Sequence, residues 1–368
     1  MTTIPAMPNA HSHAFQRALR GRGERPGGEH RDDFWTWRTE MFALAGSLGP
    51  DSMRERAERT YREMRAAGYG VVGEFHYVHH QPDGTPYADP NEMAKAVAEA
   101  ALAAGLPIVL LPAAYHRNGW DGSDQPPLEG QRRFCDPDVE SFIARVDELR
   151  AWADGREGVG VGIAAHSVRA VPSGWLEVIA EHSERHRIVR HVHAHEQRAE
   201  LAQCRAEHGC SPIELLERTG FLSPTASVIH GIHVSVEDVE LLARSGTTVV
   251  SCPTTEGNLG DGYLPAMAYL AASVPIAIGS DSQVRIDPFE EARELETGSR
   301  RESESRAGLL ASVGDLWAEL CASGMRSLGL ASVGSVEIDL EHPDLAGIHE
   351  HDLALALATC ASAGIVRP

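Results

Sequence analysis

Residues 4–13 read IPAMPNAHSH, an apolar run that is followed at once by two histidines separated by one serine. The run predicts a short strand over residues 4–8, with His11 and His13 directly after it. Alternate side chains of an extended chain point to the same face, so both imidazoles can reach one metal ion. The stretch therefore predicts the first strand of a sheet whose end carries metal ligands.

Seven further short apolar runs follow along the chain, and stretches with a helical pattern separate them. The expected strands cover residues 70–73, 108–111, 159–164, 188–192, 227–229, 247–250 and 276–278. Strands that alternate with helices are typical of a parallel sheet, and eight βα repeats favour a (β/α)8 TIM-type barrel. No Gly-x-Gly-x-x-Gly or Walker loop follows any of these strands, which disfavours a nucleotide-binding Rossmann sheet.

Capping signals mark several of the expected helices. A stretch over residues 91–104 is alanine-rich, and a helix over residues 137–153 has Asp136 as its cap and proline at its first position. Ser235 opens a capping-box pattern for a later helix. The loop over residues 113–135 is long enough to cover an active site, although a plain surface excursion is the other interpretation.

The composition restricts the class of partner. Among the 368 residues, 53 acidic and 33 basic ones give a net charge of −20, which opposes binding to nucleic acid or to an anionic membrane. No apolar run reaches the roughly 18 residues of a membrane span, and the first residues lack a signal-peptide pattern. The six cysteines show no Cys-x-x-Cys spacing, which fits a reducing compartment. We expect a cytoplasmic protein, and a homodimer is compatible with this sequence.

Potential ligands also stand at the ends of other expected strands. His193 closes the fifth strand, His230 closes the sixth, and Asp281 follows the eighth. Active sites of (β/α)8 barrels gather at the carboxyl ends of the strands. With His11 and His13, the side chains of His193 and Asp281 supply three nitrogens and a carboxylate. Such a set suits Zn²⁺ or Fe²⁺ and leaves a position for water.

Glu196 lies three residues after His193, where the chain turns out of the fifth strand. A carboxylate there can overhang a metal-bound water as a proton shuttle, or it can be a first-turn helix glutamate favoured by the helix dipole. We expect six other histidines to be solvated, namely His182, His186, His208, His342, His349 and His351. The sequence leaves open the roles of His76, His79, His80 and His195.

Five stretches resemble the formiminoglutamate deiminases, a group within the amidohydrolase superfamily. They are residues 7–17 (MPNAHSHAFQR), 34–38 (FWTWR), 73–77 (GEFHY), 166–171 (HSVRAV) and 258–262 (NLGDG). The resemblance runs from about residue 7 to residue 342. It implies a barrel of the amidohydrolase kind and the hydrolysis of N-formimino-L-glutamate to N-formyl-L-glutamate and ammonia, a step of histidine degradation.

The resemblance also implies roles for single residues. One Zn²⁺ per chain would be held by His11, His13, His193 and Asp281. Glu196 would protonate the departing nitrogen, His230 would stabilise the tetrahedral centre, and Asp281 would take the proton of the water. The small dicarboxylate substrate would be held by Gln16, Arg38, Tyr115, His166 and Arg169. The two arginines make physical sense as forks for two carboxylates.

Two other functions stay open at the level of the sequence. A deaminase of a nucleobase-like or aminated heterocycle would share the metal ligands, but it would have no need of paired arginines. A lapsed, non-catalytic paralogue would bind a metabolite without turnover.

The sequence near the two chain ends predicts a second, smaller structural unit beside the barrel. Residues 1–330 are expected to form the barrel, and residues 331–368 a C-terminal segment with a strand over residues 336–340. The family usually has a strand-rich segment before the first histidine pair, whereas ten residues precede His11 here. We therefore expect a reduced β side domain, with residues 331–368 as its remnant. Gln283 also stands where the family often has a histidine.

Overall fold

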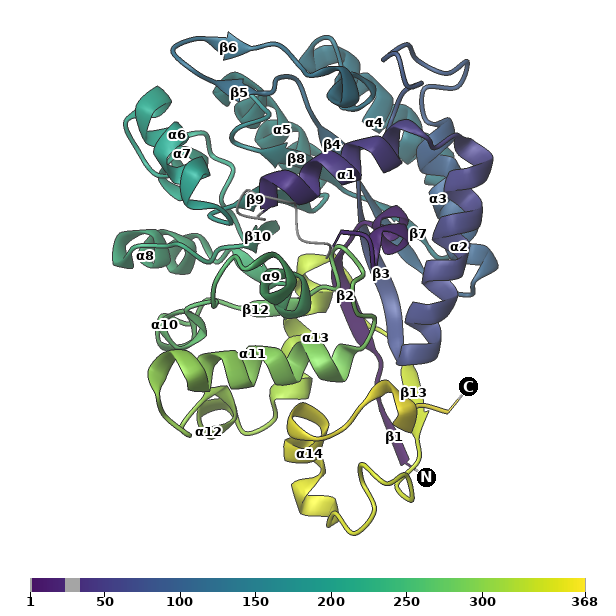
Figure 1. The fold of residues 1–368 in the computed structure, drawn as a ribbon, viewed down its shortest axis with the longest axis vertical. Helices are drawn as coiled ribbons and strands as arrows, with labels where there is room; N and C mark the ends of the chain where they lie inside the picture. The colour runs from purple at the N-terminus through teal and green to yellow at the C-terminus, as the bar shows by residue number, and fades with distance from the viewer. Residues whose placement is uncertain (1, 24–33, 368) are drawn as a thin grey trace.

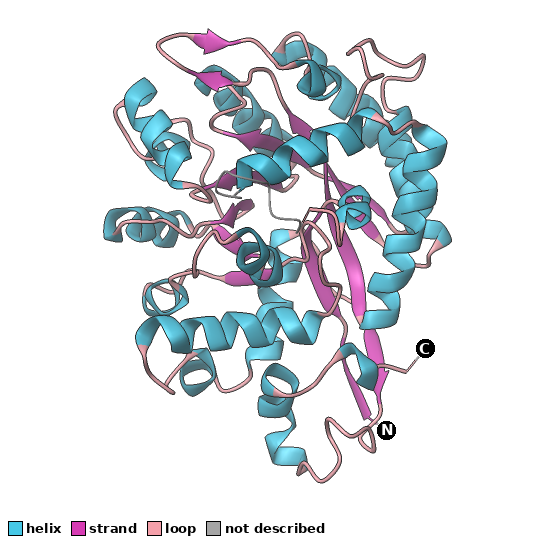
Figure 2. Cartoon of the chain, viewed as in Figure 1, coloured by secondary structure: helices cyan, strands magenta, loops and turns pink. Residues whose placement is uncertain are grey.

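The computed structural model describes residues 2–23 and 34–367, and side chains are discussed for residues 2–23 and 37–367. Eight parallel strands form a nearly closed barrel in the order β2, β3, β4, β8, β9, β10, β11, β12, and helices surround it (Figures 1 and 2). The predicted (β/α)8 class is confirmed.

The barrel strands are β2 (Met7–Ser12), β3 (Tyr69–His76), β4 (Ile108–Ala114), β8 (Ile163–Ser167), β9 (Arg190–Ala194), β10 (Ala226–His230), β11 (Thr248–Ser251) and β12 (Ile276–Ile278). Outside this path, β7 (Val159–Val161) pairs with β4, and β5 (Gly119–Trp120) forms a hairpin with β6 (Asp124–Gln125). Near the chain ends, β1 (Thr2–Pro5) pairs antiparallel with β13 (Ser335–Ile338).

The α-helices are α1 (Phe34–Gly46), α2 (Pro50–Ala67), α3 (Glu92–Ala103), α4 (Val139–Ala153), α5 (Ser173–His186), α6 (Arg198–His208), α7 (Pro212–Arg218), α8 (Val236–Ser245), α9 (Pro253–Leu259), α10 (Ala266–Ala271), α11 (Pro288–Ser303), α12 (Leu309–Val313), α13 (Leu316–Ser327) and α14 (Leu353–Thr359). Within residues 2–23 and 34–367 there are also four short 3-10 helices, η1 (Ala14–Leu19), η2 (Glu129–Phe134), η3 (Glu350–Asp352) and η4 (Ala363–Ile365). The Ser235 capping box at the start of α8 is confirmed.

The main core lies between the strands and the surrounding helices. Every residue of β4 is buried, as expected for a parallel strand that is covered on both faces. A smaller cluster contains Ile229, Val250 and Ala277, which are register partners across β10, β11 and β12. His193 of β9 is the register partner of Ile229, so its side chain faces the same side of the sheet as this cluster.

Barrel closure joins β2 to the residues after β12. The amide of Asp281 donates to the carbonyl of His11 at 3.0 Å, and the amide of His13 donates to the carbonyl of Asp281 at 2.9 Å. Gly279 permits this contact, because a Cβ built there would lie 2.7 Å from the carbonyl oxygen of His11. The closure therefore sets the distance between the ligands of the first and last barrel strands.

The structure corrects the expected first strand over residues 4–8. That segment belongs to two strands, because the chain changes partners at Ala6. The Ala6 amide donates to Gly334 next to β13, whereas the amide of Met7 donates to Gly68 next to β3. His11 thus lies inside β2 rather than after it. The expected strand over residues 159–164 is also two strands, β7 and β8, which Gly162 separates.

The start of α4 differs from the prediction as well. The helix begins at Val139, and the side chain of Asp138 caps it by accepting from the amide of Ser141. Asp136 cannot act as the cap, because Arg145 holds its buried carboxylate through two hydrogen bonds of 3.1 and 2.7 Å.

Two histidines that were expected to be solvated are not. His182 is buried between α4 and α5, and His208 is largely covered beside Glu207. His182 is covered because it faces Asp147 of α4, and His208 because it lies beside Glu207. The exposed positions of His349 and His351 agree with the prediction.

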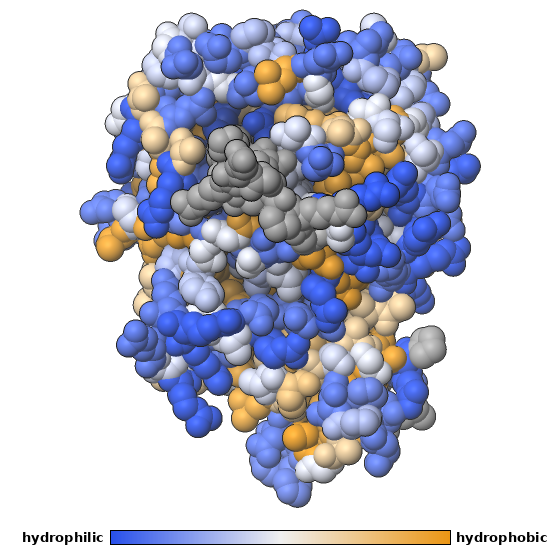
Figure 3. All heavy atoms as spheres, in the orientation of Figure 1, coloured by the Kyte–Doolittle hydropathy of each residue, from blue (hydrophilic) through white to orange (hydrophobic). Residues whose placement is uncertain are grey.

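Hydrophilic residues cover most of the face drawn in Figure 3. Among residues 2–23 and 34–367, no helix combines the length and the apolar character that crossing a bilayer demands. The β1–β13 pair and α14 lie together at the end of the molecule that carries both termini (Figure 1). The domain boundary at residue 330 stays a prediction.

The first prediction concerns barrel closure. Gly279→Ala should destabilise the protein by about 1–3 kcal/mol, because the new methyl group has to separate β12 from His11. Chemical denaturation measures this change. Gly174→Ala is the control, since a Cβ at this position in α5 meets nothing within 4 Å. Equal stability of the two variants would contradict the closure argument.

Candidate metal centre and active site

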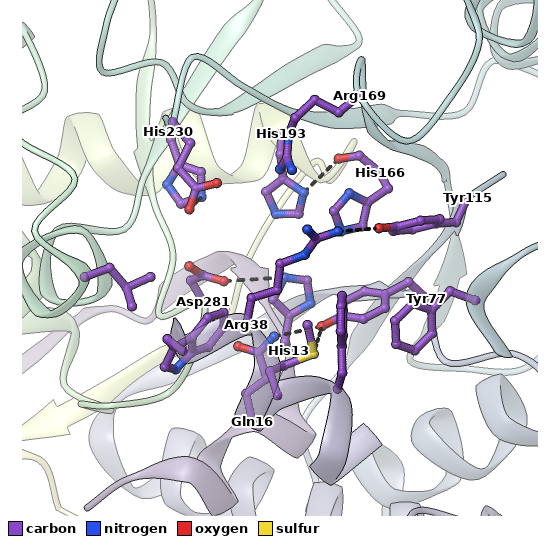
Figure 4. Close-up of a pocket in the computed structure, with 16 residues that line it drawn as sticks. His13, Gln16, Arg38, Tyr77, Tyr115, His166, Arg169, His193, His230 and Asp281 are labelled. Atoms are coloured by element: carbon purple, nitrogen blue, oxygen red, sulfur yellow. Dashed lines mark hydrogen bonds and ion pairs between the residues drawn. The ribbon is translucent and has the colours of Figure 1, made fainter. Parts of the chain in front are cut away.

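The side chains predicted to form a site lie at the carboxyl ends of the barrel strands. His11 lies in β2, His193 in β9 and His230 at the end of β10, while Asp281 follows β12. Figure 4 shows His13, His193, His230 and Asp281 around one cavity. The structure therefore brings together residues that are far apart in the sequence.

Four of these residues form a compact donor set. Nε2 of His11 lies 3.1 Å from Nε2 of His193 and 3.3 Å from Oδ1 of Asp281. Nε2 of His13 lies 3.4 Å from the same Asp281 oxygen. One ligand atom each of His11, His13 and His193 lies within 4.8 Å of the others. All four side chains are buried.

The hydrogen bonds of two imidazoles fix which nitrogen can bind a metal. Nδ1 of His13 lies 2.8 Å from the carbonyl oxygen of Phe75, and Nδ1 of His193 lies 2.9 Å from that of His166. A carbonyl can only accept, so Nδ1 carries the proton in both rings and Nε2 presents its lone pair to the centre.

The protonation state of the histidines agrees with a metal centre. Burial lowers the pKa of His11, His13 and His193, which favours the neutral imidazoles that metals bind. The pKa of Asp281 is lowered although burial acts to raise it, because His11 and His13 stabilise its charge. Three neutral nitrogens and one carboxylate fit a borderline divalent ion such as Zn²⁺ or Fe²⁺.

Glu196 and His230 form a second group beside these donors. Nε2 of His230 lies 3.7 Å from Oε1 of Glu196, and its Nδ1 lies 3.2 Å from Oε1 of Glu256. Glu256 is itself fixed, since it accepts from the amide of Cys252 at 2.7 Å and from the hydroxyl of Ser251 at 2.9 Å. His230 is thus oriented from its far side, with Nε2 toward the cavity.

These neighbours shift the pKa values of both groups. Burial raises the pKa of Glu196 to about 7, against the opposing charges of His230 and Arg169. Burial acts to lower the pKa of His230, but Glu196 and Glu256 outweigh it and raise that pKa to about 10. A carboxylate that titrates near neutral pH is suited to carry a proton during a reaction.

The residues predicted to hold a substrate line the same cavity, namely Gln16, Arg38, Tyr115, His166 and Arg169. Arg38 of α1 donates to the hydroxyl of Tyr115 at 3.0 Å, and Gln16 donates to the hydroxyl of Tyr77 at 2.9 Å. Arg38 and Gln16 are thus held by the hydroxyls of two tyrosines that line the same cavity.

The loop over residues 113–135 contributes to this cavity. Tyr115 and Phe134 both line it. Gln131 of η2 donates to the hydroxyl of Tyr115 at 2.6 Å and so ties the end of the loop to its start. The two ends of the loop thus line the cavity, whereas its β5–β6 hairpin is not among the lining residues.

Sequence reasoning missed the residues that support the ligands. Glu74 of β3 accepts from the hydroxyl of Ser12 at 2.6 Å and from the amide of Ala14 at 2.7 Å, on either side of His13. Gln283 donates to Ser12 at 3.0 Å and to the carbonyl of Asp281 at 2.8 Å. Glu74 lies in the stretch GEFHY and Gln283 two residues after Asp281, but side-chain contacts between strands leave no periodic signal in a sequence.

Two of the histidines whose roles the sequence left open, His79 and His195, make hydrogen bonds to the backbone. Nδ1 of His195 lies 2.8 Å from the carbonyl of His233, and its Nε2 accepts from the amide of Ile213 at 3.2 Å. His79 lies 2.9 Å from the carbonyl of Ala113. These rings connect segments around the site, and none of them lines the cavity.

Comparisons with known proteins agree with this geometry. Residues 2–339 match the amidohydrolase family. The chain is 38% identical over 362 residues to a curated formimidoylglutamate deiminase of Pseudomonas aeruginosa, covering 96% of this chain and 78% of that protein. A 5-methylthioadenosine/S-adenosylhomocysteine deaminase of Halobacterium salinarum is 27% identical, with coverage of 96% and 77%.

Two crystal structures extend the comparison. An amidohydrolase from Brucella melitensis superposes with a TM-score of 0.90 at 33% identity, covering 99% of this chain and 84% of that one. An adenosine deaminase from Xanthomonas campestris with bound zinc superposes with a TM-score of 0.80, at 22% identity and with coverage of 99% and 77%. The second likeness supports the fold alone.

The second prediction tests the support of the ligands. Gln283→Ala should weaken metal binding by roughly 10–100-fold, because residues that orient ligands have effects of this size. Competition with a chelator measures the affinity. Ser282→Ala is the control, since Ser282 contacts Thr255 rather than a ligand. Unchanged affinity in Gln283→Ala would show that Asp281 needs no such support.

Proposed function

The chain belongs to the amidohydrolase family, and on that premise we propose that it hydrolyses N-formimino-L-glutamate to N-formyl-L-glutamate and ammonia. The 38% identity to a formimidoylglutamate deiminase supports this activity. We propose one catalytic metal ion per chain, Zn²⁺ or else Fe²⁺. It would be held by His11, His13, His193 and Asp281.

The presence of two arginines in one cavity favours a substrate with two carboxylates. Arg38 and Arg169 line the cavity beside the metal donors, in a protein whose net charge is −20. An arginine binds a carboxylate through two parallel hydrogen bonds, which gives orientation as well as charge. Two carboxylates of a glutamate derivative account for two such groups, whereas a neutral heterocycle accounts for neither.

Each remaining group has a place in the reaction. A bound divalent ion would lower the pKa of a water towards about 7. The oxygen of that water would add to the formimino carbon as Asp281 takes one of its protons. Both protons of the water would then reach the terminal nitrogen through Asp281 and Glu196, with Glu196 protonating the nitrogen that departs. The carbon–nitrogen bond would break as the carbonyl of the formyl group forms, and ammonia would leave. His230, protonated between two carboxylates, would stabilise the oxygen of the tetrahedral centre.

The third prediction concerns Glu196. Glu196→Gln should keep the metal but lower kcat by about 10²–10⁴-fold, because glutamine preserves the shape and cannot carry the proton. Elemental analysis and steady-state kinetics measure the two quantities. Glu200→Gln is the matched control, since this buried carboxylate accepts from the Glu196 amide and does not line the cavity. Near-normal turnover of Glu196→Gln would contradict the proton-transfer role and favour a glutamate that only stabilises the start of a helix.

The fourth prediction tests the substrate. Arg169→Met should lower kcat/KM for N-formimino-L-glutamate by an amount equivalent to about 2–5 kcal/mol, because a desolvated carboxylate loses its partner. Metal content should stay the same. A neutral formimino compound that lacks both carboxylates should be a poor substrate for the parent and should respond little to the substitution.

The comparison between the two compounds separates a carboxylate contact from general damage to the site. If kcat/KM for N-formimino-L-glutamate changes by less than about threefold, equivalent to about 0.7 kcal/mol, the carboxylate role of Arg169 is wrong. Deamination of a heterocyclic amine such as guanine by the same protein would then favour the alternative class of substrate.

A further inference from the structure

A second group of metal-ligating side chains lies on the outside of the barrel, between α4 and α5. His182 and His186 stand one helical turn apart on α5, and Asp147 faces them from α4. Nε2 of His182 lies 3.2 Å from Oδ1 of Asp147, and the centroids of the two imidazoles are 4.4 Å apart. One ligand atom of each residue lies within 4.8 Å of the others.

His182 is arranged like a ligand rather than like a core histidine. Only 5% of its side chain is exposed, and its Nε2 makes no hydrogen bond to any described residue despite the nearby carboxylate. Burial lowers the pKa of His182 against the opposing charge of Asp147, and Arg150 and Arg185 act in the same direction as burial. Its imidazole is therefore neutral near pH 7 and can offer a lone pair.

A neighbouring arginine competes with a bound cation for the carboxylate of Asp147. Nη1 of Arg150 lies 3.0 Å from Oδ1 of Asp147, so a metal ion has to share or displace this contact. Arg185 is instead paired with Glu181 at 2.6 Å. The side chain of Asp147 is 46% exposed, which leaves the group open to solvent. Arg150 should thus limit the affinity of the site without blocking entry.

We propose that Asp147, His182 and His186 bind a divalent transition-metal ion of the class that prefers imidazole, such as Zn²⁺, Ni²⁺ or Cu²⁺. Two histidines at positions i and i+4 of a helix present their rings to one ion, and a carboxylate from a neighbouring helix completes three protein ligands. Water would fill the remaining positions. The ion would join α4 to α5, independently of the catalytic centre and of the proposed activity.

Nickel dialysis of the purified protein tests this site. The protein keeps its own barrel metal and is dialysed against a series of Ni²⁺ concentrations, after which elemental analysis counts nickel and the barrel metal in each sample. We expect saturable binding of about one nickel per chain with no loss of the barrel metal. Nickel should also raise the thermal unfolding midpoint, because a ligand of the native state stabilises it.

Variants assign the nickel to these residues. His186→Asn should weaken nickel binding by on the order of tenfold or more and should remove the thermal shift. Arg150→Gln should strengthen binding by up to about fivefold, the range that a partly exposed ion pair contributes. His351→Asn is the control, because His351 lies beside His349 in an exposed histidine pair away from α5 and should change nothing.

Three outcomes would overturn the proposal. The proposal is wrong if no nickel binds beyond the barrel metal, if nickel replaces that metal one for one, or if His186→Asn binds nickel as tightly as the parent. The thermal midpoint of His186→Asn without nickel shows whether the variant is folded. Should that variant unfold, Asp147→Asn on the other helix takes its place, with the same loss of nickel expected.

Discussion

Closure of the barrel between β2 and the residues after β12 is the contact on which the site depends. Asp281 donates its amide to His11 and accepts through its carbonyl from His13, so one pair of backbone contacts fixes three proposed ligands. A glycine at position 279 lets the two segments approach this closely. Without this closure, the proposed ligands of the first barrel strand and of the segment after the last one would not meet at one ion.

Hydrogen-bond acceptors behind the histidine rings orient the side chains of the site. Backbone carbonyls hold two imidazoles with their lone pairs inward, and Glu256 holds His230 from behind. His230 thus has a carboxylate on each side, which limits the penalty of burying its charge. Arg38 and Arg169 bring positive charge into the cavity of a protein whose net charge is negative. The geometry supports hydrolysis of an anionic substrate.

Much of this arrangement could be predicted from the sequence. Strand ends of a (β/α)8 barrel converge, so polar residues at those positions could be predicted to form one site from the sequence alone. Residues without such a pattern could not be placed. Glu74 and Glu256 act through contacts across strands, and His182 is buried by the packing of two helices. The partner change at Ala6 depends on β13, a segment at the other end of the chain.

The central claim is that the metal centre and the arginine-lined cavity act together on N-formimino-L-glutamate. Proton NMR of a reaction mixture tests it most directly, because it identifies the product while ammonia is assayed in the same sample. We predict N-formyl-L-glutamate and ammonia in equal amounts, loss of both with a chelator, and recovery when Zn²⁺ is restored. Product formation that persists after complete metal removal, or no product from metal-loaded protein, would contradict the account.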